Sequence, residues 1–185
     1  ILFNNTVTGK NVSLVVKKSE LNRALNVIHG EIFGVSKKIN IAIFGHGLVG
    51  GTLINQILES ATAIEKRKDV KLNIFAIANS KNVLLNKNGV TPNWKNEIQN
   101  KGTLYSIQDV IKYANENHLE NLIAVDNTAS TDFVENYIPL IESSFDLISS
   151  NKVANTLSYS FYKKLRKVLA DNQKTYLYET NVGAG

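Results

Sequence analysis

An almost continuous apolar run that passes directly into a glycine cluster restricts the fold of this chain more than any other feature. Residues 39–44, Ile-Asn-Ile-Ala-Ile-Phe, have the composition of a strand buried on both faces of a parallel sheet. Residues 45–51, Gly-His-Gly-Leu-Val-Gly-Gly, then match the pattern G-x-G-x-x-G. Apolar residues recur every four positions at Val49, Leu53 and Ile57, which is the spacing of a helix. Strand, glycine loop and helix in this order predict a dinucleotide-binding unit.

Each glycine of this loop has a separate task in such a unit. The first allows a tight turn, the second lets the backbone approach a pyrophosphate, and the third lets the helix pack closely on the strand. The free N–H groups and positive dipole at the start of the helix then attract the phosphates. The cofactor-binding residues predicted here are Gly45, His46, Gly47, Leu48, Val49 and Gly50.

Strand and helix patterns alternate through the rest of the chain. Strands are predicted over 71–78, 122–125, 145–148 and 175–178, and a further strand and helix over 11–16 and 19–33. Helices are predicted to begin at Ser106 and to span 132–143 and 156–172, with Pro139 kinking or shortening the second. Residues 82–103 are polar and contain Pro92 and the only Trp, so we expect an excursion there. The predicted fold class is α/β, with a Rossmann-type, doubly wound, mostly parallel sheet.

Polar clusters follow the predicted strands where a parallel sheet binds its ligands. They occupy Gly45–Gly51, Asn79–Lys81, Asp126–Ser130, Ser150–Asn155 and Glu179–Gly185. Because ligands of open α/β sheets bind beyond the carboxyl ends of the strands, these clusters predict one site.

The end of the second strand bears on the choice of cofactor. A carboxylate about 20 residues after the glycine loop usually binds the adenosine ribose of NAD. Asp69 has that spacing but precedes the strand, and the strand ends in Asn79, Ser80 and Lys81. With no carboxylate to repel a 2′-phosphate and a lysine to attract it, the sequence favours NADP(H) over NAD(H).

Composition excludes several other classes of protein. The 185 residues suit one domain, or one domain and a remnant, and the absence of Cys excludes thiolate metal sites and disulfides. The net charge is +5, but the basic residues are scattered in short groups, so we predict no nucleic-acid partner. With no membrane-spanning run and no export signal, we predict no membrane association and a cytoplasmic location. Because residue 1 is Ile and Met is absent, we expect a piece of a longer chain.

Four motifs after the glycine loop resemble one family. They are Phe-Ala-Ile-Ala-Asn-Ser-Lys at 75–81, Val-Asp-Asn-Thr-Ala-Ser at 125–130, Asn-Lys-Val-Ala-Asn at 151–155 and Tyr-Glu-Thr-Asn-Val-Gly-Ala-Gly at 178–185. In this order they resemble the cofactor-binding half of homoserine dehydrogenase, and the resemblance covers about residues 38–185. The strand at 11–16 and the helix after it resemble the end of the ACT regulatory region of aspartokinase. We therefore expect an ACT-like remnant at 1–36 and a Rossmann domain at 37–185, as in a bifunctional aspartokinase–homoserine dehydrogenase.

The resemblance implies reversible hydride transfer between a nicotinamide cofactor and aspartate 4-semialdehyde or homoserine. It implies that Lys152 lies near substrate and nicotinamide, and that the nicotinamide end is lined by Thr128, Ser130 and Asn151. It also implies a sodium or potassium site at Glu179, Val182 and Ala184, and a parent that forms a homo-oligomer. Because the substrate region of the family follows these motifs, we expect the 185 residues alone to bind cofactor but to turn over little substrate.

Two departures and two alternatives accompany this interpretation. Ser149-Ser150 stand where many relatives have Thr-Pro, and Val153 replaces a frequent second lysine. One alternative is another NAD(P)-dependent dehydrogenase on the same fold, since fold does not determine substrate. The other is a non-catalytic nucleotide-sensing regulatory module.

Overall fold

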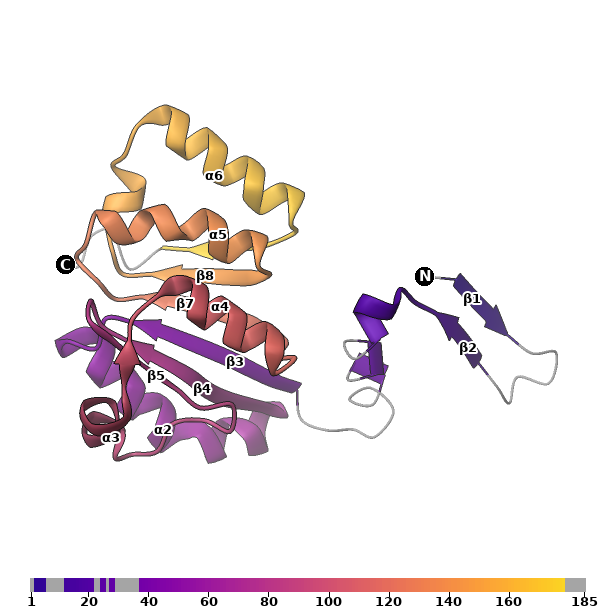
Figure 1. The fold of residues 1–185 in the computed structure, drawn as a ribbon, viewed down its shortest axis with the longest axis horizontal. Helices are drawn as coiled ribbons and strands as arrows, with labels where there is room; N and C mark the ends of the chain where they lie inside the picture. The colour runs from indigo at the N-terminus through magenta and orange to yellow at the C-terminus, as the bar shows by residue number, and fades with distance from the viewer. Residues whose placement is uncertain (1, 6–11, 22–23, 26, 29–36, 179–185) are drawn as a thin grey trace. The chain divides into compact units, whose positions relative to one another are not determined.

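The computed structural model of the chain describes residues 2–5, 12–21, 24–25, 27–28 and 37–178 (Figure 1). The chain divides into two compact units, Ile1–Lys37 and Lys38–Gly185. In the first unit, strands β1 (Leu2–Asn5) and β2 (Val12–Val15) pair antiparallel, which confirms the predicted strand near residues 11–16. A short 3-10 helix, η1 (Lys18–Glu20), follows. Of the helix predicted over 19–33, residues 21, 24–25 and 27–28 are helical, and most of the rest lies outside the described residues.

The second unit is built on a seven-stranded sheet with the strand order β6-β5-β4-β3-β7-β8-β9. The strands are β3 (Lys37–Phe44), β4 (Val70–Ala78), β5 (Asn82–Leu85), β6 (Thr103–Leu104), β7 (Leu122–Asp126), β8 (Phe145–Ser149) and β9 (Tyr176–Leu177). Strand β7 runs parallel to both β3 and β8, and β9 runs parallel to β8. This sheet confirms the predicted mostly parallel, Rossmann-type α/β fold.

Helices cover both faces of the sheet because its central strands are apolar on both sides (Figure 1). Ile41 and Ile43 of β3 pack in a core with α2 (Leu48–Lys68) and α3 (Trp94–Lys101). Ala42 and Phe44 pack in a second core with α4 (Ile107–Glu116), α5 (Tyr137–Glu142) and α6 (Tyr159–Asp171). Within the described residues, no helix combines the length and the apolar character that a membrane crossing requires.

The segment 82–103 is more regular than the sequence predicts. It contains β5, α3 and the start of β6, and it extends the sheet at one edge by two antiparallel strands. Val83 and Leu84 are buried although they belong to a short apolar run, 83–85, that lies between polar residues. Trp94 is also buried, and its indole N–H donates to Asn55 Oδ1 of α2 over 3.1 Å. A four-residue strand and a two-turn helix leave too few apolar positions for a periodic pattern, which is why the sequence suggested only an excursion.

Helices α4 and α6 each begin after a serine, and α5 is shortened at its start. Ser106 is the N-cap of α4, as predicted, although its side chain makes no capping hydrogen bond. Pro139 is the third residue of the six-residue α5, and a 3-10 helix, η2 (Asp132–Asn136), precedes it, so the predicted shortening is confirmed. Helix α6 begins later than predicted because Ser158 Oγ accepts the Phe161 N–H over 3.3 Å.

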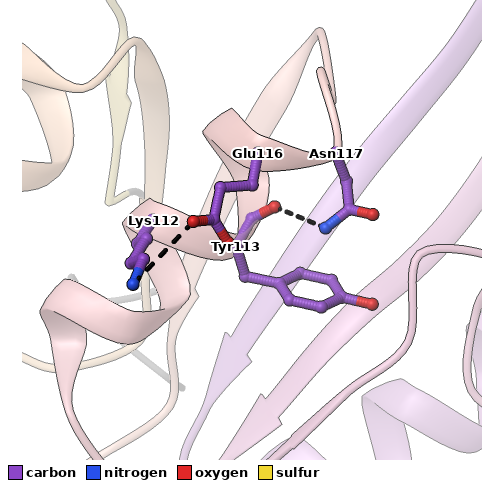
Figure 2. Close-up of polar contacts among 4 residues, drawn as sticks. All are labelled: Lys112, Tyr113, Glu116 and Asn117. Atoms are coloured by element: carbon purple, nitrogen blue, oxygen red, sulfur yellow. Dashed lines mark hydrogen bonds and ion pairs between the residues drawn. The ribbon is translucent and has the colours of Figure 1, made fainter.

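Helix α4 is tied to the sheet through Tyr113 (Figure 2). On its exposed side, Lys112 and Glu116 form an ion pair of 3.8 Å. The Asn117 side chain donates to the Tyr113 carbonyl over 2.9 Å and closes the last turn. The Tyr113 ring stacks on Phe75 of β4 with ring centres 6.5 Å apart, and its hydroxyl accepts the Lys87 N–H over 2.9 Å.

A buried pair of amides joins the early parts of β3 and β4. Asn73 Nδ2 donates to Asn40 Oδ1 over 2.7 Å and to the Lys87 carbonyl over 3.2 Å. Asn40 Nδ2 donates to the Glu120 carbonyl over 2.6 Å. Both asparagines are buried, so water cannot replace a hydrogen-bond partner that a substitution removes.

We predict that Asn73→Ala lowers the free energy of unfolding by about 1–3 kcal/mol, because it removes the donor to the buried side-chain oxygen of Asn40, Oδ1. Urea unfolding followed by circular dichroism measures the change. Asn100→Ala, on the exposed side of α3, is the matched control and should change stability by less than about 0.5 kcal/mol. Equal unfolding midpoints for Asn73→Ala and the unaltered chain would contradict this.

Candidate functional site

A cavity of about 520 Å³ opens at the carboxyl ends of β3, β4 and β7. The chain leaves β3 for β4 on one side and later returns to β7 on the other, so the cavity lies at the switch point of the sheet. Three aromatic rings form an apolar wall of this cavity. The ring of Phe44 lies 4.8 Å from that of Phe133 and 6.3 Å from that of Tyr105, measured between ring centres. The predicted residues that line it are Gly45, His46, Gly47, Asn79, Ser80, Thr128 and Ser130.

Gly45 begins the loop in a conformation that favours glycine. Its φ is +83°, and a Cβ there would lie 2.8 Å from the Asn127 carbonyl oxygen. Its N–H donates to the Ala78 carbonyl over 2.8 Å, which ties the end of β3 to the end of β4. The turn therefore requires a residue without a side chain.

Gly50 and Gly47 have opposite surroundings. A Cβ on Gly50 would lie 1.9 Å from the Gly45 carbonyl oxygen, so the first turn of α2 rests directly on the loop. A Cβ on Gly47 would meet nothing within 4 Å, which leaves the backbone there open to a ligand. The first turn of α2 contains no acidic residue, so its positive end is uncompensated. Leu48 and Val49 are 87% and 58% exposed and lie at this same end.

The His46 side chain is held by Asn79. Asn79 Oδ1 accepts the N–H groups of Lys81 and Asn82, each over 2.7 Å, and this fixes the orientation of the amide. Asn79 Nδ2 therefore faces His46 Nε2, 3.0 Å away, as a donor. The imidazole then accepts at Nε2 and carries its proton on Nδ1. The ring edge packs on Trp94 with ring centres 5.5 Å apart.

A smaller cavity of about 260 Å³ shares His46 and Asn79 with the larger one. Trp94, Lys95 and Gln99 of α3 line it. The Lys95 ammonium lies 5.5 Å from the centre of the Trp94 ring. This cavity could not be predicted from the sequence, because α3 lies in the segment expected to be an excursion.

The loops after β7 and β8 are joined beneath the cavity wall. Asn151 Nδ2 donates to Asp126 Oδ2 over 3.1 Å, to Thr128 Oγ1 over 3.3 Å and to the Ser130 carbonyl over 2.9 Å. Asn151 is buried, so the structure places it under Thr128 and Ser130 and not among the residues of the cavity wall. Lys152 follows it and is exposed, with no hydrogen bond or ion pair of its ammonium among the described residues.

Tyr105, Asp132, Phe133 and Asn136 also line the larger cavity and were missed by sequence reasoning. The Tyr105 hydroxyl is buried and has no hydrogen-bond partner among the described residues. Burial, and secondly the nearby Asp126, raise the pKa of Tyr105 to about 12. No local pattern marks Tyr105 because it reaches the site through the antiparallel edge of the sheet, where Tyr105 N–H donates to the Lys81 carbonyl over 2.7 Å.

Of the remaining predicted residues that the structure describes, none lines the larger cavity; they are Leu48, Val49, Gly50, Lys81 and Lys152. Lys81 is exposed beside it. Glu179, Val182 and Ala184 lie outside the described residues, so the structure does not describe the predicted cation site. In the part of the chain that it does describe, no group of three His, Asp or Glu side chains is arranged to hold a metal ion.

We predict that Gly50→Ala lowers the free energy of unfolding by about 1–3 kcal/mol, because the new Cβ forces α2 away from the Gly45 carbonyl. Gly47→Ala makes the same chemical change in open space and is the matched control, with an expected change below about 0.5 kcal/mol. Thermal unfolding of the two variants measures the difference. Equal destabilisation by both would contradict the close contact between the loop and α2.

Known proteins resemble this chain over most of its length. A family model described as "Homoserine dehydrogenase, NAD binding domain" matches residues 45–179. The chain is 39% identical over 176 residues to the bifunctional aspartokinase/homoserine dehydrogenase of Buchnera aphidicola subsp. Acyrthosiphon pisum, which covers 94% of this chain and 21% of that protein. It is 32% identical over 177 residues to the Haemophilus influenzae protein of the same name, covering 95% of this chain and 22% of that one.

Solved structures share the fold. A hyperthermophilic archaeal homoserine dehydrogenase in complex with NADPH superposes with a TM-score of 0.59 at 22% identity, over 78% of this chain and 44% of that chain. The chain thus spans about a fifth of the length of the two bifunctional relatives and under half of this structure. The family match begins at the first glycine of the loop and continues past β9. This chain belongs to the homoserine dehydrogenase family, and its residues 45–179 match the NAD-binding domain of that family.

Proposed function

We propose that the chain is the cofactor-binding part of a bifunctional aspartokinase–homoserine dehydrogenase and that it binds NADP(H) in the larger cavity. The complete protein would reversibly reduce aspartate 4-semialdehyde to homoserine, a step towards threonine and methionine. The observation that carries the proposal is the meeting of the glycine loop, the end of β4 and the loop after β7 around one cavity of about 520 Å³. The names of the bifunctional relatives support a homoserine dehydrogenase activity for the complete protein.

The open N-terminus of α2 would bind the pyrophosphate. Gly47 leaves the backbone accessible there, and the helix dipole favours negative charge. The adenosine would then extend towards the end of β4, with Asn79 and Ser80. The nicotinamide would extend towards the ends of β7 and β8, where Thr128 and Ser130 offer hydroxyl groups.

Lys152 is the residue we propose for catalysis. Lys152 lies in the loop after β8, next to Asn151. The side-chain amide of Asn151 joins this loop to the loop after β7. When bound, the cofactor supplies or accepts the hydride. The Lys152 ammonium would stabilise the negative charge that develops on the substrate oxygen, or would take part in its proton transfer. The side chain is exposed, so it is free to meet a substrate held by another part of the complete protein.

Several further assignments belong to the same proposal. The unit Ile1–Lys37 would be the remnant of an ACT-like regulatory domain, and the unit from Lys38 the cofactor domain. Sodium or potassium would bind at Glu179, Val182 and Ala184. The complete protein would form a homo-oligomer in the cytoplasm.

The preference for NADP(H) is proposed from the end of β4. Asn79, Ser80 and Lys81 present no carboxylate to a 2′-phosphate, and Lys81 and Lys95 place positive charge on this side of the site. The archaeal homoserine dehydrogenase of similar fold was solved with NADPH.

We predict that the chain binds NADPH more tightly than NADH, because only NADPH carries the 2′-phosphate. Lys81→Ala should weaken NADPH binding about tenfold, or ~1.4 kcal/mol, and leave NADH binding unchanged. Trp94 is the only tryptophan and contacts His46, so quenching of its fluorescence reports binding. Lys167→Ala, an exposed lysine of α6, is the matched charge control. Equal affinity for both cofactors would refute the preference, and binding of neither would refute the proposed function.

We predict that Lys152→Ala in the complete protein lowers kcat for homoserine oxidation by about 10²–10⁴-fold, as expected for loss of an acid–base or charge-stabilising group. The dissociation constant for NADPH should change less than about threefold, because the phosphates bind elsewhere. Steady-state kinetics and the fluorescence titration separate the two effects. Lys163→Ala, exposed on α6, is the control, and full activity of Lys152→Ala would remove Lys152 from the mechanism.

A further inference from the structure

The hydroxyl of Tyr137 reaches from α5 into the junction of β7 and β8. Tyr137 is completely buried. Its hydroxyl donates to Asp126 Oδ2 over 2.8 Å and lies 2.8 Å from Ser149 Oγ. Asp126 and Ser149 are paired in the register of β7 and β8 and are the last residues of these strands. One phenol thus contacts the final side chain of each strand before the chain enters the two loops of the site.

The two side chains that Tyr137 contacts are also the ones that hold those loops. Asp126 Oδ1 accepts the Thr128 N–H over 2.8 Å. Asp126 Oδ2 accepts Asn151 Nδ2 over 3.1 Å. Ser149 Oγ accepts the Asn151 N–H over 3.0 Å. The loop after β7 and the loop after β8 therefore depend on the orientation of the same pair.

Backbone pairing alone does not set that orientation. The ladder between β7 and β8 fixes the main chain up to Asp126 and Ser149, but the carboxyl and hydroxyl groups can still rotate. Tyr137 comes from a different element and has its ring packed edge-on against Phe133, with centres 6.2 Å apart. Burial, and secondly the charge of Asp126, raise the pKa of Tyr137 above its usual value, so the phenol remains a donor at neutral pH.

We propose that Tyr137 is a positioning residue of the cofactor site, whose hydroxyl orients Asp126 and Ser149. Through them it sets the places of Thr128 and Asn151 on the nicotinamide side of the cavity. This inference rests on the proposed function, because it takes the two loops as cofactor-binding. Tyr137 itself contacts neither cofactor nor substrate.

The test is Tyr137→Phe, which keeps the ring and removes the hydroxyl. We expect its dissociation constant for NADPH to rise about tenfold. We also expect the backbone N–H groups of Thr128 and Asn151 to exchange with solvent at least about tenfold faster in hydrogen-exchange NMR, while the amides of β4 keep their rates. A variant that binds NADPH like the unaltered chain would overturn the inference.

Tyr113→Phe is the matched control (Figure 2). It also removes a hydrogen-bonded phenol hydroxyl, but this one accepts from Lys87 in the turn after β5, outside the cavity wall. NADPH binding within twofold of the unaltered chain is expected. Weakening of NADPH binding by Tyr113→Phe to the same extent would assign the effect to stability and overturn the inference.

Two further measurements keep the inference decidable. If Tyr137→Phe does not fold, Ser149→Ala is used in its place. It removes the contact between the Tyr137 hydroxyl and Ser149 Oγ and leaves the hydrogen bond from Tyr137 to Asp126. Unchanged NADPH affinity in Ser149→Ala would then overturn the inference. If the unaltered chain binds neither NADPH nor NADH, the proposed function fails, and the exchange rates of Thr128 and Asn151 in Tyr137→Phe alone decide whether the hydroxyl holds the loops.

Discussion

The contact between the Gly45 carbonyl and the first turn of α2 is the constraint on which the rest of the site depends. A helix can rest on the end of a strand this closely only if the helical residue has no side chain, and Gly50 meets that requirement. The contact directs the N-terminus of α2 over the cavity and places Gly47 at its rim. Gly45 also approaches the ends of β4 and β7 through its N–H and its α-carbon, and the segments that follow these strands form further walls together with Tyr105 and η2.

Much of this arrangement could be predicted from the sequence because it depends on local patterns. The apolar run of β3, the glycine spacing and the period of α2 each lie within one short segment, and physical rules connect them directly. The rule that ligands bind beyond the carboxyl ends of parallel strands then predicts that Asn79, Thr128 and Ser130 share one site, and all three line the larger cavity.

The rest depends on contacts between distant segments. Tyr105 reaches the cavity only because β5 and β6 fold back antiparallel on β4. Strands of four and two residues are too short to show a periodic pattern in the sequence. Tyr137 looks like an ordinary core residue in the sequence, and only the pairing of Asp126 with Ser149 reveals what its hydroxyl contacts. Asn151 was predicted at the nicotinamide end of the site, and only the fold reveals that its side-chain amide donates to Asp126, Thr128 and Ser130 from a buried position.

The hydrogen bond between Asn79 and His46 also couples the end of β4 to the glycine loop. Asn79 stands at the end of the second parallel strand, where a carboxylate would favour NAD, yet its amide accepts two backbone N–H groups and donates to His46 Nε2 at the same time. An aspartate could accept the same two N–H groups but has no N–H to donate. His46 Nε2, beside the ring of Trp94, would then have to carry a proton, either by a change of tautomer or by a second protonation of the ring. A substitution at position 79 would therefore act in two places at once, on the charge at the end of β4 and on the position of the proton in the His46 ring of the glycine loop.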